Sequence, residues 1–405
     1  MGLKSSLIDT ARGLESLAAR GSGLLPGTSI QFGPPRRSAT TLTVGPESGI
    51  TRHALIPARS PLRAVAELAD PPLDRLMLQP EKAAIREIFV AEVPQGRYWG
   101  RFHGYIIDRH DTLLTDLSPT FTKEGRRHDA LNHSRLPPLR EFRGSVAVIN
   151  TVFGDNFHHW LLDAVPRLDW LRRAGYTWTD FDHFLFPSKL LRHHLETIER
   201  VGIDPGKVVC SSYGMHIRAD RLVVPAHTEP SFNHWVYDYT PEGLRFVREL
   251  FLKDNPHLAQ PHARRILVSR ERAAARRLVQ GDRALQLLSE FGFEKVLLED
   301  YSLREQAAMF HQAEAVILPT GGNLANFVFC QPGTVAVELF SPNYTPNFTH
   351  AFLGEIGLRY YGVVADKISR PRPGGRVANE DIDVDPDRLA SIIRDALAKR
   401  PPSGT

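Results

Sequence analysis

The sequence has few cysteines and no long hydrophobic segment, and each absence narrows the class of protein. Its 405 residues contain two cysteines, Cys210 and Cys330. So few thiols exclude a disulfide-stapled scaffold and favour a reducing compartment. No run approaches the roughly eighteen apolar residues of a membrane span, and no basic segment followed by an apolar one marks a secretion signal. We therefore expect a cytoplasmic protein.

The charge balance argues against partners that need a strong electrostatic field. Lys and Arg number 50 and Asp and Glu 46, so the formal net charge is +4, and it is spread along the chain. This diffuse excess does not predict nucleic-acid binding. It suits an anionic substrate or a peripheral contact with a membrane surface. The 42% hydrophobic and 24% charged residues are typical of a globular protein.

The length predicts more than one domain. We divide the chain into residues 1–80, 81–245, 246–366 and 367–405. The first segment has apolar residues at helical spacing and then a Gly-, Pro-, Ser- and Thr-rich linker. This pattern fits a helix on a membrane or on a partner, but it favours a short helix that packs on the body of the protein or frays. The last segment is a linker and a helix that we expect to cross back to the first domain.

Apolar segments alternate with amphipathic segments through both central domains. Short strands are expected near 88–93, 104–108 and 112–116, and longer alternation follows. The later strands are expected at 145–150, 183–187, 221–225, 265–269, 293–298, 315–318, 335–340 and 358–364, with helices at 157–174, 189–201, 284–291, 303–312, 348–356 and 387–399. This rhythm predicts an α/β fold of two Rossmann-like domains, with parallel sheets facing a cleft. Ligands bind such sheets at the carboxyl ends of the strands.

The segment 319–342 is the most informative part of the chain. A buried strand ends before Gly321 and Gly322, and a helix is expected from about Leu324. Glycines at such a junction let the backbone approach a ligand, and free N–H groups at a helix start attract an anion. Glu338, near the end of the next strand, suits a pair of sugar hydroxyls. The pattern predicts a site for a phosphate-bearing nucleotide, although Gly-Gly also closes ordinary strand–helix loops.

Two further constellations carry chemistry. Asn156 is a suitable N-cap for a helix whose polar stripe contains His159, Asp163 and Arg167. His159 and Asp163 are one turn apart, so the carboxylate can orient the imidazole. The alternative is a solvated helix face. Arginines that follow the strand at 265–269, Arg270 first, suit a pyrophosphate because guanidinium groups offer several donors and a permanent charge. The alternative there is a solvated basic loop.

Two patterns that suggest metal ligands have simpler explanations. His158 and His159 are adjacent, and adjacent residues on a helix point apart. The acidic run 381–387 comes just before a helix, where Asp385 or Asp387 acts as a cap with Pro386 in the first turn. We therefore expect no metal site.

Three segments of the chain resemble glycosyltransferase family 61. They are HHWLLDAVPRL, ILVSRERAAARRLVQ and TGGNLANFVFCQPGTVAVELFSP, and they occur in the family's order. The resemblance is to bacterial members described as capsular polysaccharide biosynthesis proteins. It implies a GT-B fold, inverting chemistry without a metal and without a cofactor, and a nucleotide-sugar donor, a UDP-sugar first, bound mainly by the second domain. The implied partner is a glycan or lipid-linked glycan acceptor, and no oligomeric state is implied.

The resemblance assigns roles to individual residues. It implies that Asp163 or His159 deprotonates the acceptor. The positions implied to bind the donor are Arg270, Arg277, Thr320, Gly321, Gly322, Asn323, Leu324, Asn326 and Glu338. Two departures from the family pattern stand out. Thr320 replaces a histidine, so it cannot supply an imidazolium charge, and Gln280-Gly281 replaces Asn-Glu.

These departures keep two rival functions open. One is a catalytically silent protein that binds a nucleotide or glycan within a polysaccharide assembly complex. The other is a GT-B transferase with a different activated donor. Release of a nucleoside diphosphate in the presence of an acceptor separates the first rival from a transferase, and a panel of donors separates the second.

Overall fold

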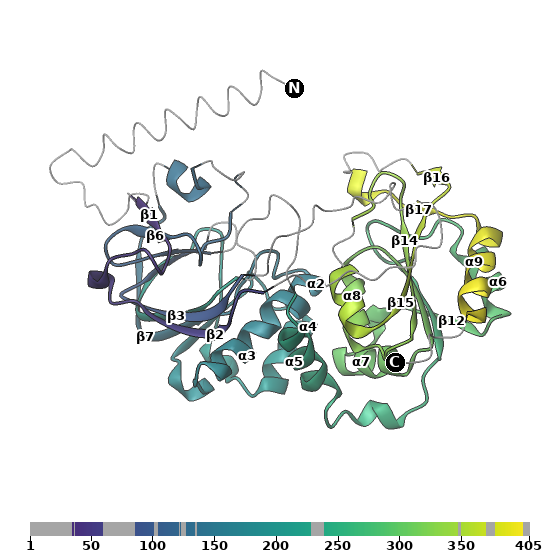
Figure 1. Ribbon diagram of the computed structural model, residues 1–405, viewed down its shortest axis with the longest axis horizontal. Helices are drawn as coiled ribbons and strands as arrows, with labels where there is room; N and C mark the ends of the chain where they lie inside the picture. Colours follow the sequence, from purple (N-terminus) through teal and green to yellow (C-terminus); the bar gives the residue numbers. More distant parts are fainter. Residues whose placement is uncertain are drawn as a thin grey trace, which may run out of the picture. The chain divides into compact units, whose positions relative to one another are not determined.

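The structure is a computed structural model of two compact units. The described residues of the first unit lie between 35 and 227, and those of the second lie between 239 and 399. In Figure 1 the first unit runs from purple to teal and the second from green to yellow. The residues that the structure describes are 35, 37–59, 86–100, 104–120, 122, 127–133, 136–227, 239–346, 350–369 and 377–399.

The first unit is built on a ten-stranded sheet with helices packed on it. Its strands are β1 (Arg37–Ala39), β2 (Thr51–Ile56), β3 (Ile88–Pro94), β4 (Arg97–Trp99), β5 (Tyr105–Ile107), β6 (Thr112–Leu114), β7 (Arg140–Val148), β8 (His183–Phe186), β9 (Val208–Cys210) and β10 (His216–Pro225). Its helical segments are α2 (Phe157–His159), the π-helical η5 (Trp160–Ala164), α3 (Val165–Arg173), α4 (Arg192–Val201), and the 3-10 turns η2 (Pro46–Ser48), η4 (Asp129–Asn132), η6 (Trp178–Asp180) and η7 (Pro205–Lys207).

This sheet is mixed, whereas the sequence predicted a parallel one. The strands β10, β7, β8 and β9 pair in parallel, which is the Rossmann-like part. The strands β3 and β4 pair antiparallel with β10, and β4, β5 and β6 pair antiparallel in turn. The reason is loop length, because only four residues, 108–111, join β5 to β6 and a parallel crossover needs about a dozen.

Part of the predicted N-terminal linker belongs to this sheet. The strand β2 pairs antiparallel with β3, and β1 pairs in parallel with β6. The expectation of irregular chain over residues 37–59 is therefore wrong. These strands form by pairing with segments more than thirty residues away, and local composition does not report such pairing. The predicted N-terminal helix lies outside the described residues.

The second unit has a five-stranded parallel sheet with the order β12-β11-β13-β14-β15. Its strands are β11 (Arg265–Val268), β12 (Phe293–Val296), β13 (Ala315–Pro319), β14 (Val335–Phe340), β15 (Arg359–Val364) and the separate pair β16 (Lys367–Ile368) and β17 (Ile382–Asp383). Its helices are α5 (Pro241–Leu252), α6 (Gly281–Ser289), α7 (Leu303–Gln312), α8 (His350–Ile356), α9 (Pro386–Ala398), and the 3-10 segments η9 (Pro256–Ala259), η10 (Leu298–Asp300), η11 (Gly322–Phe329) and η12 (Val377–Asn379).

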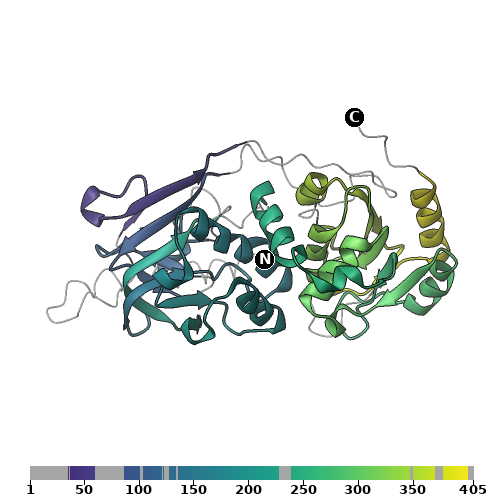
Figure 2. The same cartoon turned by 90° about the horizontal axis from the view of Figure 1, so that it is seen from below.

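Helices cover both faces of this second sheet. Figures 1 and 2 show α6 and α9 on one face and α5, α7 and α8 on the other. The core on the α6 side includes Leu389, Ile393 and Ala396 of α9. This helix therefore packs on the second unit's own core, whereas we expected it to cross back to the first domain. Its apolar residues recur at helical spacing, which predicts burial but does not say against which sheet.

Capping residues fix where several helices begin. The Ser302 hydroxyl accepts a hydrogen bond from the Glu305 amide, and the Glu305 carboxylate accepts one from the Ser302 amide. The Asp385 carboxylate accepts from the Arg388 amide at the start of α9, with Pro386 next to it. The predicted capping role of Asp385 is thus confirmed.

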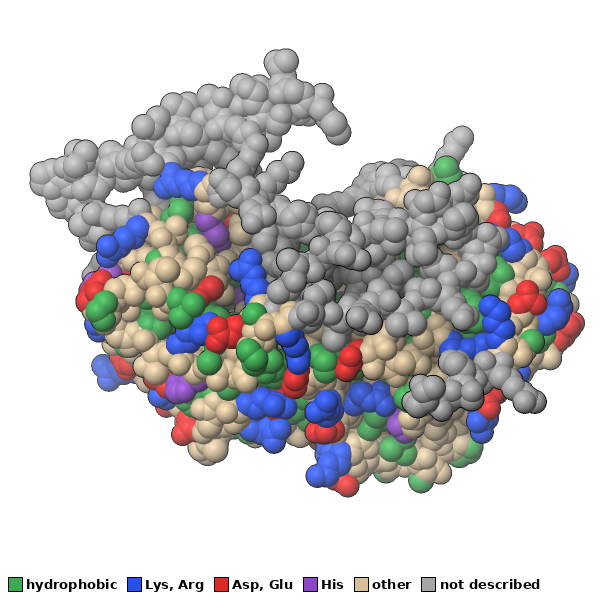
Figure 3. Space-filling model, viewed as in Figure 1, with side chains coloured by type: hydrophobic (Ala, Val, Ile, Leu, Met, Phe, Trp, Pro, Cys, Tyr) green, Lys and Arg blue, Asp and Glu red, His purple; other side chains and the backbone are tan. Residues whose placement is uncertain are grey.

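Other global features agree with the composition. Both cysteines are free. None of the helices among the described residues is long and apolar enough to span a bilayer. Figure 3 shows Lys and Arg side chains interspersed with Asp and Glu over the described surface of the face drawn.

Candidate active site

Three loops of the second unit meet at the carboxyl edge of its parallel sheet. The strands β11, β13 and β14 are neighbours in register, so the residues after their ends lie at one edge. Arg270 follows β11, Gly321 follows β13, and Tyr344 lies in the turn after β14. The edge where the sequence predicted a nucleotide site is thus the edge where its loops converge.

Gly321 has a backbone that only glycine adopts readily. Its φ is 152° and its ψ is −167°, a combination that L side chains avoid. A Cβ atom at this position would lie 3.0 Å from Nη1 of Arg270 and 3.6 Å from Nη1 of Arg276. The two guanidinium groups therefore lie directly over the loop backbone. The helix that follows is a 3-10 helix, η11, rather than the predicted α-helix.

Arg270 and Arg276 lie beside this loop, and the Glu299 carboxylate opposes only part of the fall in the pKa of Arg270. Burial, together with the positive charge of Arg276, lowers the pKa of Arg270 to about 10, so it stays protonated at neutral pH. Arg270 donates from Nε to the Ala275 carbonyl at 3.3 Å, and Arg276 lies over the ring of Tyr344, 5.6 Å from its centroid. Neither arginine forms an ion pair with another described residue. Two adjacent guanidinium groups without a direct ion pair among the described residues offer donors of the kind that suit an anion.

Arg277, by contrast, is held by a carboxylate. Its Nη2 lies 2.6 Å from Oδ2 of Asp381, and its backbone amide donates to Oδ1 of the same residue at 2.9 Å. Gln280 makes a similar contact with Asp383 at 3.0 Å. These contacts join the arginine loop to the segment before α9. The donor contact predicted for Arg277 therefore competes with an existing ion pair, and Arg276 is the arginine that accompanies Arg270.

The sequence offered both Arg276 and Arg277 as pyrophosphate ligands, and the family resemblance selected Arg277, because the direction of each side chain depends on the backbone. The φ of Arg276 is +58°, which is uncommon for a residue other than glycine, asparagine or aspartate. Such a residue turns its side chain away from the direction that an extended loop would give it. A run of two arginines was visible in the sequence, but no signal in it distinguishes which of them faces the glycine loop.

Of the remaining residues predicted to bind the donor, two lie in the partly exposed loop and two lie in the buried core. Gly322 and Asn323 open η11 and are partly exposed. Leu324 and Asn326 are fully buried, and the Asn326 amide donates to Gln306 at 3.0 Å. These two side chains hold the loop in place, so a donor contact at either position would come from the backbone.

Thr320 and Glu338 lie deeper than a ligand-contacting residue usually does. Thr320 is 1% exposed, and its hydroxyl has no hydrogen-bond partner among the described residues. Glu338 is 0% exposed and accepts a hydrogen bond from the Tyr360 hydroxyl at 2.7 Å. Burial of the nearby Tyr344 raises the pKa of that tyrosine, and the Glu338 carboxylate raises it further. The ribose contact predicted for Glu338 remains a prediction.

The first unit holds the His159–Asp163 pair on an interrupted helix. Asn156 caps its start by accepting a hydrogen bond from the His158 amide at 2.9 Å. A π-helical turn, η5, separates α2 from α3, and the Val165 amide bonds to the Trp160 carbonyl there. Such turns insert one extra residue and occur often at functional sites.

The two side chains form a direct hydrogen bond across this turn. Nδ1 of His159 lies 2.7 Å from Oδ2 of Asp163, and the two side chains are 12% and 17% exposed. The predicted pairing is confirmed. A carboxylate on Nδ1 fixes the tautomer, so Nε2 is the nitrogen that takes up a proton. The pair has the arrangement of a general base with an orienting carboxylate.

Arg167, the last residue of the predicted polar stripe, is buried rather than solvated. It is 2% exposed, and burial lowers its pKa to about 9 against the opposing effect of Tyr98 and Asp163. Its Nη2 donates to the Val148 carbonyl at 3.1 Å, and its Nη1 lies 3.3 Å from Nδ1 of His227. A guanidinium only donates, so Nδ1 of His227 accepts and its ring is neutral. The network ties the helix to the ends of β7 and β10.

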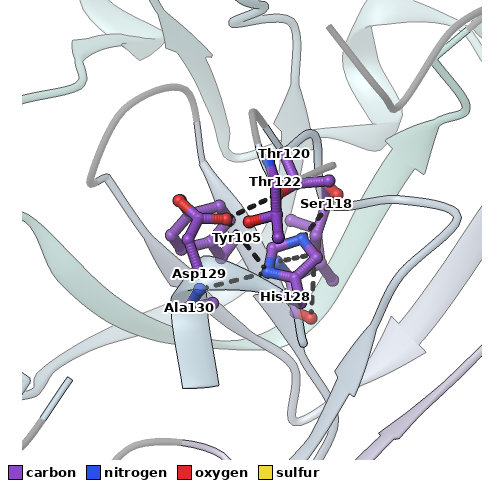
Figure 4. A network of polar contacts seen from close by, with 8 residues as sticks. Tyr105, Ser118, Thr120, Thr122, His128, Asp129 and Ala130 are labelled. Carbon is purple, nitrogen blue, oxygen red and sulfur yellow. Dashed lines mark hydrogen bonds and ion pairs between the residues drawn. The ribbon is translucent and has the colours of Figure 1, made fainter. Parts of the chain in front are cut away.

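A second polar network of the first unit has a structural role (Figure 4). The Asp129 carboxylate accepts from the Tyr105 hydroxyl at 2.5 Å and from the Thr120 hydroxyl at 2.6 Å. The His128 ring donates from Nε2 to the Ser118 carbonyl at 3.1 Å, and burial lowers its pKa. Each group is satisfied by the protein itself, so the network fastens η4 to β5.

The fold and these contacts define an α/β protein of two units, one with two arginines over a glycine loop at the edge of a parallel sheet and one with a histidine–aspartate pair. Residues 157–337 match the family model Glycosyltransferase 61. The matched stretch begins at the first residue of α2 and ends within β14, so it contains His159, Asp163, Arg270 and the glycine loop, and it stops one residue before Glu338. The match supports the family resemblance and a glycosyltransferase activity, with a sugar donor and a glycan acceptor in general. The chain matches no curated protein.

Proposed function

We propose that this chain is an inverting, metal-independent glycosyltransferase of surface polysaccharide synthesis, such as that of a capsule. Its donor is a nucleotide-sugar, a UDP-sugar first, and its acceptor is a glycan or lipid-linked glycan. The family match supports the transferase class. The observation that supports the donor site is the pair of guanidinium groups of Arg270 and Arg276 over Gly321. A GT-B arrangement, with the donor on the second unit and the acceptor on the first, is part of this proposal.

The proposed reaction assigns each group one task. The acceptor hydroxyl oxygen attacks the anomeric carbon as the bond from that carbon to the donor's phosphate oxygen breaks, which inverts the configuration. The hydroxyl proton passes to Nε2 of His159, while Asp163 holds the ring and stabilises the imidazolium. The leaving nucleoside diphosphate gains a negative charge, which Arg270 and Arg276 stabilise. No metal is required because the guanidinium groups supply the positive charge.

A nucleotide-binding assay tests the donor site. Thermal stability is measured with UDP, GDP, CMP and dTDP, each with and without EDTA. We expect UDP to raise the melting temperature with or without EDTA, since a ligand at a hundred times its dissociation constant stabilises the folded state by about 2.7 kcal/mol. The shift should disappear in Arg270→Ala and remain in Arg272→Ala, because Arg272 is an exposed neighbour already paired with Asp300 at 2.5 Å.

Two results would contradict the donor assignment. They are the absence of a shift with every nucleotide and a shift that survives in Arg270→Ala. A shift that EDTA abolishes would contradict metal independence alone. Incubation with a panel of UDP-sugars and glycans, followed by detection of UDP, then tests transfer.

The second candidate is a catalytically silent protein of a polysaccharide assembly complex. It is favoured by Thr320, whose buried hydroxyl cannot replace the positive charge of the histidine that the family usually has. This candidate predicts nucleotide or glycan binding without release of UDP. Release of UDP that depends on both an acceptor and His159 excludes it.

We also propose a cytoplasmic location with a peripheral contact at the inner face of the membrane. A formal net charge of +4 and a lipid-linked acceptor support it. Co-sedimentation with vesicles of anionic phospholipid tests it directly. Binding that is absent at low ionic strength would overturn this part of the proposal and leave the donor assignment intact.

A further inference from the structure

An exposed phenylalanine lies beside the proposed base. Phe153 is in the loop after β7, three residues before the Asn156 cap, and 37% of its surface is exposed. Its ring centroid is 5.3 Å from that of His159, with the planes tilted by 44°. The ring therefore borders the histidine that we assign as the general base.

The backbone at Phe153 is in a conformation that folding alone does not favour. Its φ is +56°, in the left-handed region that a bulky side chain adopts rarely. Local strain of this kind gathers at ligand-binding positions, where the surrounding structure holds it in place. An aromatic ring that is both strained and partly exposed contributes less to the core than its size allows.

Hydrogen bonds hold the backbone of this loop. The Gly154 amide donates to the Thr151 carbonyl at 3.1 Å, and the Asn156 amide donates to the Phe153 carbonyl at 2.7 Å. His194 of α4 lies with its Nε2 3.0 Å from the Gly154 carbonyl. The backbone that carries the ring is thus held before any ligand arrives, which lowers the entropy cost of binding.

A second exposed aromatic residue rises from a neighbouring loop. Tyr213 follows β9 and is 59% exposed. The two loops are joined because the side-chain amide of Asn150 donates to the Ser211 hydroxyl at 3.0 Å. Both loops leave the carboxyl edge of parallel strands, so Phe153 and Tyr213 lie at the same edge of the first sheet.

We propose that Phe153 is the surface on which the acceptor's sugar ring stacks, with Tyr213 contacting a further sugar of the same glycan. A pyranose ring has an apolar face of C–H groups and a rim of hydroxyls, so an aromatic face binds the former while His159 reaches the latter. Aromatic walls with a few placed polar groups are typical of small-ligand sites. The ligand class is therefore a neutral glycan of at least two sugars. This inference rests on the proposed transferase function.

Phe153→Gly is the sharpest test, because glycine accepts a φ of +56° without strain. The variant removes the ring and is expected to fold at least as well as the natural chain. We expect its KM for the acceptor glycan to rise about tenfold, a typical loss for one stacking contact. Its KM for the UDP-sugar and its thermal shift with UDP should not change. Phe153→Tyr, which keeps an aromatic face, should retain the natural KM.

A matched control removes an exposed apolar side chain from the same unit. Leu195 is 50% exposed on α4, and Leu195→Ala should leave both KM values unchanged. An unchanged acceptor KM in Phe153→Gly, or an equal rise in Leu195→Ala, overturns the proposal.

Binding to an immobilised array of neutral oligosaccharides separates this proposal from the transferase function. If the natural protein binds a glycan and Phe153→Gly does not, the stacking surface is supported. If no transfer is detected in that case, the transferase assignment fails and the stacking surface stands. Glycan binding that the variant retains, or natural protein that binds no glycan, overturns the stacking surface.

Discussion

Substitution of Gly321 by alanine tests the central feature of the donor site. The backbone at φ 152° and ψ −167° lies in a region that is essentially restricted to glycine. Holding an alanine there costs about 1–3 kcal/mol. We therefore expect the free energy of unfolding of the second unit to fall by about 2 kcal/mol, as measured by urea denaturation.

The same substitution disturbs the guanidinium of Arg270. The new Cβ would lie 3.0 Å from Nη1 of Arg270, tighter than nine in ten contacts that real Cβ atoms make. The guanidinium has to move, and a charge-assisted hydrogen bond to a phosphate contributes about 1.5–3 kcal/mol. Loss of one such bond lowers nucleotide affinity by about ten- to a hundredfold. Isothermal titration with UDP, well below the melting temperature, measures it.

A matched control separates the general effect of replacing glycine by alanine from the specific effect of Gly321→Ala. Gly281 is the first residue of α6, and a Cβ there would meet its nearest neighbour, Leu278, at 3.9 Å, which is ordinary contact. Gly281→Ala should preserve both stability and UDP affinity. Gly321→Ala with unchanged stability would refute the strained backbone. A destabilised Gly321→Ala that binds UDP with natural affinity would refute the placement of Arg270 on the phosphates.

Further predictions concern the base, the arginine loop and a buried histidine. Asp163→Asn should lower transfer by about a hundredfold while UDP still stabilises the protein, because the orientation and charge that Asp163 supplies to His159 are lost; natural turnover in this variant would contradict the pairing. Arg276→Ala should weaken UDP binding in titration, whereas Arg277→Ala should chiefly lower the stability of the fold through the lost ion pair with Asp381. Weaker UDP binding in Arg277→Ala, with natural binding in Arg276→Ala, would show that the loop rearranges. Burial, with two nearby arginines, lowers the pKa of His216 to about 4, so the unfolded state binds a proton between about pH 4 and 6.5 that the folded state does not. The free energy of unfolding should therefore decrease as the pH is lowered through this window, by at most about 1.4 kcal/mol per pH unit from this residue. His216→Gln should flatten that slope in urea melts at pH 7, 6 and 5.

The sequence predicts the second unit well because its signals are local. The bounds of α7 and β14 agree with the expected ranges 303–312 and 335–340. Apolar periodicity defines both, and the Ser302 cap marks the start of α7. The pairing of His159 with Asp163 was predictable for the same reason, because two residues one helical turn apart are neighbours whatever the rest of the fold does.

Features that depend on long-range contacts were not predictable. The strands β1 and β2 exist through pairing with β6 and β3, and the mixed character of the first sheet follows from that pairing. Arg167 was predicted on a polar stripe, for which a solvated helix face was the alternative. It is buried after the π-helical turn η5 and donates to the carbonyl at the end of β7. A single sequence does not reveal a π-helical turn, because its periodicity changes for only one residue.

The threonine at position 320, where the family usually has a histidine, matters together with the position of Arg276 over the glycine loop. A histidine at this position would add a charge that varies with pH to the phosphate loop. Thr320 adds none, since its hydroxyl is buried without a partner among the described residues. Arg270 stays protonated throughout the physiological range, as its pKa of about 10 requires. We infer that leaving-group stabilisation has passed to this arginine pair, and that donor binding in this protein depends less on pH between 6 and 8 than a histidine-bearing loop would allow.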